Sequence, residues 1–225
     1  MSKAYQVVGI GNAVSDVIAT SGDEFLTEHG IEKGIMQLVD QPRAEVLFAA
    51  MDSRIETPGG SVANTIAGLG SLGLRTAFIG RVADDDLGLS YALAMQAEGT
   101  DFPNPPVRNA DLPTSRSMIF VSPDGERSMN TYLGISSELG PEDVPDEVLA
   151  DCEILFLEGY LFDKVPGKEA FRKAASLARQ SGARAGISLS DPFCVDRHRD
   201  DFRALVSGPL DFFLCNEEEL KSLYQ

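Results

Sequence analysis

Two adjacent glycines followed by short polar side chains form the stretch of this chain best suited to hold a small ligand. Gly59 and Gly60 let the backbone approach a bound molecule closely, where a Cβ atom would collide with it. Ser61 stands where a helix N-cap is expected, so Asn64 falls in the first helical turn, beside unpaired backbone N–H groups. The pattern predicts a rigid, donor-rich ledge suited to a polyhydroxylated ligand. A tight turn that caps an ordinary helix explains the same residues.

Two further pairs of polar residues lie close to predicted strand ends. Asn12 follows an apolar strand, and Asp16 stands four residues later, where a solvated loop aspartate or a turn former is the alternative. Asn216 and Glu219 open the helix after another strand, and their spacing puts both on one helical face, as a shared site needs. A natural N-cap followed by acidic residues at a helix N-terminus is the simpler explanation.

Strands and helices alternate along the chain, which predicts a parallel sheet covered by helices on both faces. Ligands bind such sheets at the carboxyl ends of the strands. Asn12, the loop 189–191 and Asn216 all fall at such ends. The predicted strands are 7–10, 76–82, 154–157, 185–189 and 212–214, and the predicted helices are 63–72, 87–97, 167–181 and 197–206.

Two segments interrupt the alternation. Residues 20–58 and 107–136 carry strand-like stretches, and the second contains a hairpin whose turn is 122–126. We therefore expect both segments to form a small β lid outside the main sheet of a single domain, 1–225.

Charge and cysteine content narrow the classes of partner and location. The chain has 19 basic and 35 acidic residues and a net charge of −16, which argues against nucleic acid and anionic membrane surfaces as partners. No apolar run reaches the length of a membrane span. Its 3 cysteines are an odd number and lie far apart, which favours reduced thiols in a cytoplasmic protein.

Three further features of the sequence do not indicate a metal, dinucleotide or P-loop site. Cys194 and His198 have the spacing of a metal pair or a catalytic dyad, but without further ligands we prefer a structural cysteine beside a surface histidine. Residues 68–73 spell G-x-G-x-x-G, yet they lie in and at the end of a predicted helix, whereas a dinucleotide site lies between strand and helix. No G-x-x-x-x-G-K-[ST] motif occurs, so a P-loop NTPase is excluded.

Four motifs in order resemble those of the ribokinase-like (PfkB) carbohydrate and nucleoside kinases. They are Gly11–Asp16, Thr57–Gly88, the hairpin Asp124–Ser128 and Asn216–Glu219, so the resemblance covers almost the whole chain. It implies a three-layer α/β/α sandwich with a mostly parallel sheet and a small β lid. It also implies transfer of a phosphoryl group from ATP, with Mg²⁺, to a hydroxyl of a nucleoside or a sugar.

The resemblance also assigns roles to individual residues. The aspartate equivalent to Asp16 accepts hydrogen bonds from sugar hydroxyls, a task that suits a carboxylate because charge-assisted bonds are strong. Asn216 and Glu219 are expected to order water and Mg²⁺ around the ATP phosphates, with Glu219 as the metal-associated residue. The implied acceptor-binding set is Asn12, Asp16, Gly59, Gly60, Ser61, Asn64, Leu133 and Tyr160.

Among these kinases, the segments 11–16, 159–161 and 189–193 look most like those of adenosine kinases. Tyr160 and Phe193 could stack on a purine, although core or lid packing explains both side chains equally well. Adenosine is therefore the preferred acceptor, with ribose, fructose or another sugar behind it. A homodimer stays open.

One departure from the family pattern concerns catalysis. Family members carry a Gly-Ala-Gly-Asp run whose aspartate is the general base and whose glycine amides hold the transferring phosphoryl group. No such run occurs in these 225 residues, so we expect no catalytic residue here and the general base beyond Gln225. The chain is then the acceptor-binding part of a kinase whose C-terminal portion is absent, or alternatively a non-catalytic binder on the same fold.

Overall fold

The main body of the protein is a six-stranded parallel sheet. The computed structural model describes residues 3–225, and the strand order in this sheet is β11-β10-β9-β1-β5-β6. All neighbouring pairs are parallel, as the alternation of strands and helices predicts. The strands are β1 (Tyr5–Ile10), β5 (Thr76–Ile79), β6 (Thr100–Asp101), β9 (Cys152–Glu158), β10 (Arg184–Ser188) and β11 (Phe212–Leu214).

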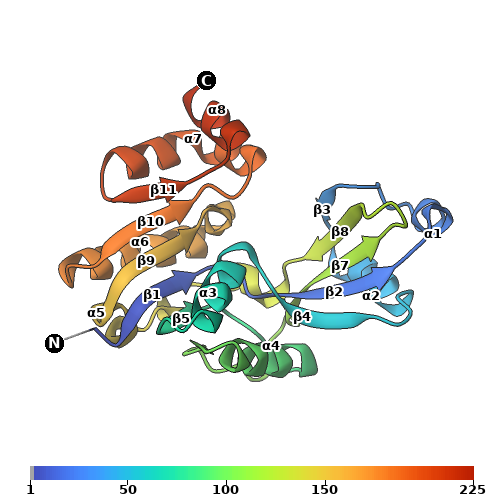
Figure 1. Cartoon of the computed structure of the whole chain (residues 1–225), viewed down its shortest axis with the longest axis horizontal. Coiled ribbons are helices and arrows are strands. Elements are labelled where there is room, and N and C mark those ends of the chain that lie inside the picture. Colours follow the sequence, from blue (N-terminus) through green and yellow to red (C-terminus); the bar gives the residue numbers. More distant parts are fainter. Residues whose placement is uncertain (1–2) are drawn as a thin grey trace.

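Helices cover both faces of this sheet because its strands are apolar on both sides. Along β1, Val8 and Ile10 join one buried cluster while Val7 joins another on the opposite face. The first cluster includes side chains from α5 (Asp146–Ala150), α6 (Val165–Gln180), α7 (Pro192–Ser207) and α8 (Glu217–Tyr224). The second includes side chains from α3 (Ser61–Ser71) and α4 (Asp86–Ala97). The predicted three-layer α/β/α sandwich is confirmed (Figure 1).

A second, five-stranded sheet stands beside the main body (Figure 1). Its strand order is β3-β8-β7-β2-β4, and one face is covered by α1 and α2 through a buried cluster that includes Val17 and Phe120. The elements are β2 (Val14–Thr20), α1 (Asp23–Glu28), β3 (Met36–Leu38), α2 (Gln41–Ala49), β4 (Ile55–Gly59), β7 (Ser115–Val121) and β8 (Arg127–Tyr132). The strands of segments 20–58 and 107–136 all lie in this sheet, and their role as a lid stays a prediction.

Two features of this second sheet differ from the sequence-based expectation. β2 begins at Val14, before the expected boundary at 20, because the chain passes from β1 into the second sheet through only Gly11, Asn12 and Ala13. The pattern also gave no sign of α1 and α2, whose short apolar faces pack on the sheet rather than follow a long helical period.

Helix α7 is longer than expected. It begins at Pro192, with Asp191 as its N-cap, instead of at residue 197. His198 interrupts it with non-helical angles, φ −126° and ψ 24°, and this kink breaks the helical period that sequence reasoning relies on. The described residues also contain three short 3-10 helices, η1 (Gly134–Glu138), η2 (Pro141–Asp143) and η3 (Gly159–Asp163). None of the helices in residues 3–225 has the length and apolar character to cross a bilayer.

Candidate functional site

The candidate site lies where the two sheets meet, at the carboxyl ends of the main strands. Asn12 stands between β1 and β2, and Glu158 is the last residue of β9. Gly59 ends β4, and Gly60 leads directly into α3. Backbone from three distant parts of the sequence therefore converges on one place, as the topology of a parallel sheet predicts.

A buried carboxylate, Glu158, holds these segments together. Its side chain is 1% exposed, and Oε2 accepts hydrogen bonds from the backbone N–H of Asn12 at 2.6 Å and from its Nδ2 at 2.8 Å. Oε1 accepts from the hydroxyl of Ser61 at 2.5 Å. Burial raises the pKa of Glu158, while these bonds and one from the backbone of Val62 oppose that rise.

Sequence reasoning missed Glu158. A signal was available in the sequence, because Glu158 is a lone acidic residue between the apolar run 154–157 and Gly159. A carboxylate at the end of a buried strand needs hydrogen-bond donors around it, unless its side chain reaches solvent. A buried carboxylate at the carboxyl end of a parallel strand is a good candidate for a site residue or for a residue that holds the site together. We call Glu158, with its hydrogen bonds to Asn12 and Ser61, the brace of the site.

Ser61 does not cap helix α3, contrary to the expectation. The N-cap is Gly60, with φ 104° and ψ 140°, and no side chain caps the helix. The reason is that the hydroxyl of Ser61 is engaged by Glu158. Asn64 does lie in the first turn, with its N–H donated to the carbonyl of Gly60 at 2.9 Å, and its side chain is exposed.

The two glycines make room for other protein atoms. A Cβ on Gly59 would lie 2.4 Å from Cγ of Asp16, and a Cβ on Gly60 would lie 2.5 Å from the carbonyl oxygen of Asn12. The carbonyl of Gly59 also accepts a hydrogen bond from the buried hydroxyl of Tyr91 at 3.1 Å. Asn12, Asp16, Gly59 and Gly60 are therefore neighbours in the fold.

Asp16 presents a half-buried carboxylate beside Gly59. Burial raises its pKa to about 6, and the charge of Arg127 partly opposes that shift. A group with this pKa is largely ionised at neutral pH and can accept two hydrogen bonds from adjacent hydroxyls. Its position at the sheet junction is suited to a polyhydroxylated ligand.

Asp16 begins a row of side chains across the second sheet. Asp16 pairs with Ser117, Ser117 pairs with Thr131, and Thr131 pairs with Leu38. Directly paired residues share a face of the sheet, here the face opposite to α1 and α2, and three strand spacings make the row about 14 Å long. The hydroxyls of Ser117 and Thr131 are hydrogen-bonded at 2.8 Å. The row thus runs from a carboxylate through hydroxyls to an apolar end.

A hollow of about 260 Å³ lies at the apolar end of this row. Leu38 and Thr131 line it together with Leu133, one of the residues assigned to the acceptor site. Its lining also includes the half-exposed Lys164, whose ammonium contacts Glu138 at 2.5 Å. The remaining lining residues are Val39, Leu112, Tyr132, Gly134 and Ser137.

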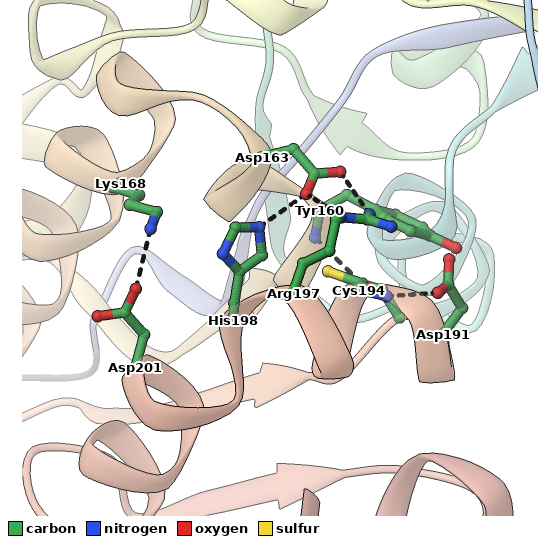
Figure 2. Close-up of polar contacts among 9 residues, drawn as sticks. Tyr160, Asp163, Lys168, Asp191, Cys194, Arg197, His198 and Asp201 are labelled. Atoms are coloured by element: carbon green, nitrogen blue, oxygen red, sulfur yellow. Dashed lines mark hydrogen bonds and ion pairs between the residues drawn. The ribbon is translucent and has the colours of Figure 1, made fainter. Parts of the chain in front are cut away.

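Tyr160 lies two residues beyond Glu158, at the start of η3. Its backbone N–H donates to Oγ of Ser190 at 3.3 Å, and its ring packs partly against the main core. Figure 2 shows its hydroxyl end lying toward Asp191. The structure therefore places Tyr160 beside the brace of the site, with much of its ring in packing contacts.

Asn216 and Glu219 contact each other at the start of α8. Both oxygens of Glu219 accept from Asn216, from its backbone N–H at 3.1 Å and from Nδ2 at 2.9 Å, while Oδ1 of Asn216 caps Glu219 N at 2.8 Å. Such a box leaves further lone pairs on the carboxylate for water. Among the described residues, no cluster of three or more metal-ligating side chains occurs.

Cys194 and His198 do not form a dyad. Cys194 is buried, and burial raises the pKa of its thiol. His198 is half-buried rather than on the surface as expected, with a side chain 14% exposed, because Nε2 lies 2.7 Å from Oδ1 of Asp163 (Figure 2). The same carboxylate accepts two bonds from Arg197, at 3.0 and 2.8 Å.

A family profile and curated relatives match most of this chain. The sequence profile of the group described as pfkB family carbohydrate kinase matches residues 39–225. Guanosine-inosine kinase of Escherichia coli (strain K12) is 25% identical over 234 residues, which cover 99% of this chain and 53% of that protein. The chain thus spans about half the length of the curated relatives it matches.

Two proteins of known structure are more similar to this chain in sequence than the guanosine-inosine kinase is. The adenosine kinase from Sinorhizobium meliloti is 47% identical with a TM-score of 0.88, over 98% of this chain and 68% of that one. A probable sugar kinase from Rhizobium etli CFN 42 is 44% identical with a TM-score of 0.90, over 99% of this chain and 68% of that one.

The glycine at the N-cap of α3 provides a test of the site's packing. Gly60→Ala should lower the free energy of unfolding by about 2–3 kcal/mol, because alanine is strained at this positive φ and its Cβ meets the backbone of Asn12. Gly68→Ala in the same helix is the matched control, since nothing lies within 4 Å of its Cβ, and it should stabilise by about 0.5–1 kcal/mol. Equal effects in urea unfolding would contradict this account.

The raised pKa of Asp16 predicts a pH dependence of stability. Its pKa is about 6 in the folded protein against 3.8 ordinarily, so the folded state binds more protons between these values. The free energy of unfolding should therefore fall by about 2 kcal/mol as pH rises through this window. Asp16→Asn should remove that part of the slope in urea titrations at several pH values. An unchanged slope would show that Asp16 is not the group responsible.

Proposed function

Because the chain belongs to the pfkB family of carbohydrate kinases, we propose that it forms the acceptor-binding part of an ATP-dependent kinase for adenosine. The row from Asp16 to Leu38 carries this proposal. Its polar end suits the ribose and its apolar end, with the hollow beside Leu133, suits the base. The similarity to the adenosine kinase from Sinorhizobium meliloti adds support.

In this arrangement each residue has a physical task. Asp16, when ionised, accepts hydrogen bonds from two neighbouring ribose hydroxyls and so fixes the orientation of the sugar. The backbone from Gly59 to Asn64 lies alongside, where no side chain intervenes at the glycines. Asn12 shapes the same pocket, and Ser61 and Glu158 keep that segment in place.

The second sheet would serve as a lid over the acceptor. The row from Asp16 to Leu38 lies on the face of this sheet opposite to the helices α1 and α2. Closing such a lid excludes water from the reacting groups and protects ATP from hydrolysis. The 20–58 and 107–136 strands would then act together, because they pair within one sheet.

ATP and Mg²⁺ are the co-substrate and its metal in this proposal. Asn216 and Glu219 would hold Mg²⁺ through ordered water, since the carboxylate oxygens already bond to Asn216. The general base and the amides that hold the transferring phosphoryl group would come from a Gly-Ala-Gly-Asp run, which residues 1–225 do not contain.

A sugar kinase is the second candidate function. A free sugar needs only the polar end of the row, the Asp16 carboxylate and the glycine ledge, and both are present. The probable sugar kinase from Rhizobium etli CFN 42 is almost as similar as the adenosine kinase. The apolar hollow is the feature that favours a nucleoside.

Substitutions at the two ends of the row should separate these candidates in the full-length kinase. Asp16→Ala should weaken acceptor binding by about 2–4 kcal/mol in calorimetry, because it leaves ligand hydroxyls unpaired. Leu38→Asp should weaken adenosine binding only, since it places a charge against the base. If Leu38→Asp changes ribose and adenosine affinity alike, or changes neither, the nucleoside proposal is wrong. Unchanged affinity for Asp16→Ala would remove its assigned role.

Residues 1–225 alone should not transfer phosphate. Loss of a general base costs about 10²–10⁴-fold in rate, and loss of the anion-binding amides adds a comparable factor. We expect no adenosine phosphorylation above background in a coupled assay with ATP and Mg²⁺, while a protein extended through the Gly-Ala-Gly-Asp segment is active. Turnover by residues 1–225 at an ordinary kinase rate would place the catalytic aspartate within this chain.

A further inference from the structure

The loop between β10 and α7 holds a strained residue beside the candidate site. Ser190 has a φ of 74°, in the left-handed region that L-residues rarely adopt. Such conformations persist where surrounding contacts enforce them, and they gather at functional sites. Here the contacts come from the segment that follows Glu158.

Gly159 and Tyr160 supply those contacts. A Cβ on Gly159 would lie 2.8 Å from the carbonyl oxygen of Ser188 and 3.0 Å from Oγ of Ser190, so only glycine lets the two loops approach this closely. The N–H of Tyr160 donates to the same Oγ at 3.3 Å. The start of η3 is thus joined to the loop that leads into α7.

Asp191 has contacts on both sides of this junction. Oδ1 accepts from the backbone N–H of Cys194 at 2.7 Å and so caps α7. Figure 2 shows the carboxylate of Asp191 and the hydroxyl of Tyr160 lying toward each other. Burial first, and then a hydrogen bond and charge from Asp191, raise the pKa of Tyr160.

The far end of η3 is fixed to the same helix. Asp163 accepts two bonds from Arg197 and contacts Nε2 of His198 at 2.7 Å. The start of η3 is therefore bonded to the loop before α7 through Tyr160 and Ser190, and its end is bonded to α7 through Asp163 and Arg197 (Figure 2).

Helix α8 is docked on the first turns of α7. The hydroxyl of Ser222 donates to the carbonyl of Pro192 at 3.1 Å and to Oδ1 of Asp196 at 2.5 Å. α8 carries Asn216 and Glu219 at its N-terminus. The start of α7 thus lies between the segment that contains Tyr160 and the helix proposed to bind the nucleotide.

We propose that Asp191 is a positioning residue for the phosphoryl-transfer reaction. Its carboxylate contacts the hydroxyl of Tyr160 and so orients the Tyr160 side chain toward the acceptor. This rests on the proposed function and on the acceptor-binding role that the family resemblance implies for Tyr160, two residues after Glu158. Asp191 would not touch the substrate. Its effect should therefore pass through Tyr160 and change acceptor binding more than the chemical step.

Three single variants of the full-length kinase separate this role from helix capping. Asp191→Ser keeps a capping oxygen but is too short to hold the tyrosine, and Tyr160→Phe keeps the ring but removes the hydroxyl. Asp191→Asn retains both a capping oxygen and a hydrogen-bonding partner for Tyr160, so it is the conservative control.

Steady-state kinetics with varied acceptor gives the main readout. Asp191→Ser and Tyr160→Phe should each raise the acceptor KM about tenfold with kcat and the KM for ATP nearly unchanged, and the double variant should be no worse than either. Asp191→Asn should stay near wild type. An unchanged acceptor KM in Asp191→Ser, or effects that multiply to about a hundredfold in the double variant, would overturn the proposal.

The test stays informative if the acceptor is not adenosine. A panel of nucleosides and sugars first identifies the acceptor that wild type phosphorylates, and failure with adenosine counts against the proposed function alone.

Unfolding constants of the same variants then test the contact between Asp191 and Tyr160 itself without any substrate. If the effects of Asp191→Ser and Tyr160→Phe on the unfolding constant simply multiply, the two side chains do not interact and the positioning role fails. Tyr160→Phe preserves packing, so it carries the kinetic test if Asp191→Ser does not fold.

Discussion

The junction of the two sheets depends on the buried carboxylate of Glu158. It binds the strand crossing at Asn12 and the helix start at Ser61, which are far apart in sequence. Removing a charge from water is costly, so such a group is kept only where several donors surround it. Here four N–H and O–H groups converge on it, and Asn12 donates its backbone and its side chain to the same oxygen. The brace leaves Asp16 and the glycines free to contact a ligand.

The requirements of this junction explain the residue types around it. Gly59 and Gly60 admit the Asp16 side chain and the Asn12 carbonyl, so no larger residue fits at either position. The hydroxyl of Ser136 donates to Oδ1 of Asn12 at 3.1 Å, which completes the partners of that side chain. In the proposed lid closure, the second sheet would move as a unit and its polar row would keep its spacing.

The main body could be predicted well from sequence, because the apolar runs 7–10, 154–157 and 185–189 are short, buried on both faces and bounded by glycine or polar residues. The hydrogen-bond partners within the candidate site were harder to predict from sequence. Ser61 resembles an N-cap locally, but its hydroxyl bonds to Glu158, 97 residues away, which no local pattern reveals. β2 was missed because it starts three residues after β1, and His198 because its partner Asp163 is 35 residues distant. Local signals find elements, whereas long-range hydrogen bonds choose the partners.

A crystal structure of the proposed full-length kinase with adenosine tests the central claim most directly. The account predicts the ribose hydroxyls on the carboxylate of Asp16, beside Gly59 and Gly60, and the base over the row toward Thr131 and Leu38, in the hollow with Leu133. Ribose hydroxyls bound away from Asp16, or a base outside the second sheet altogether, would contradict it.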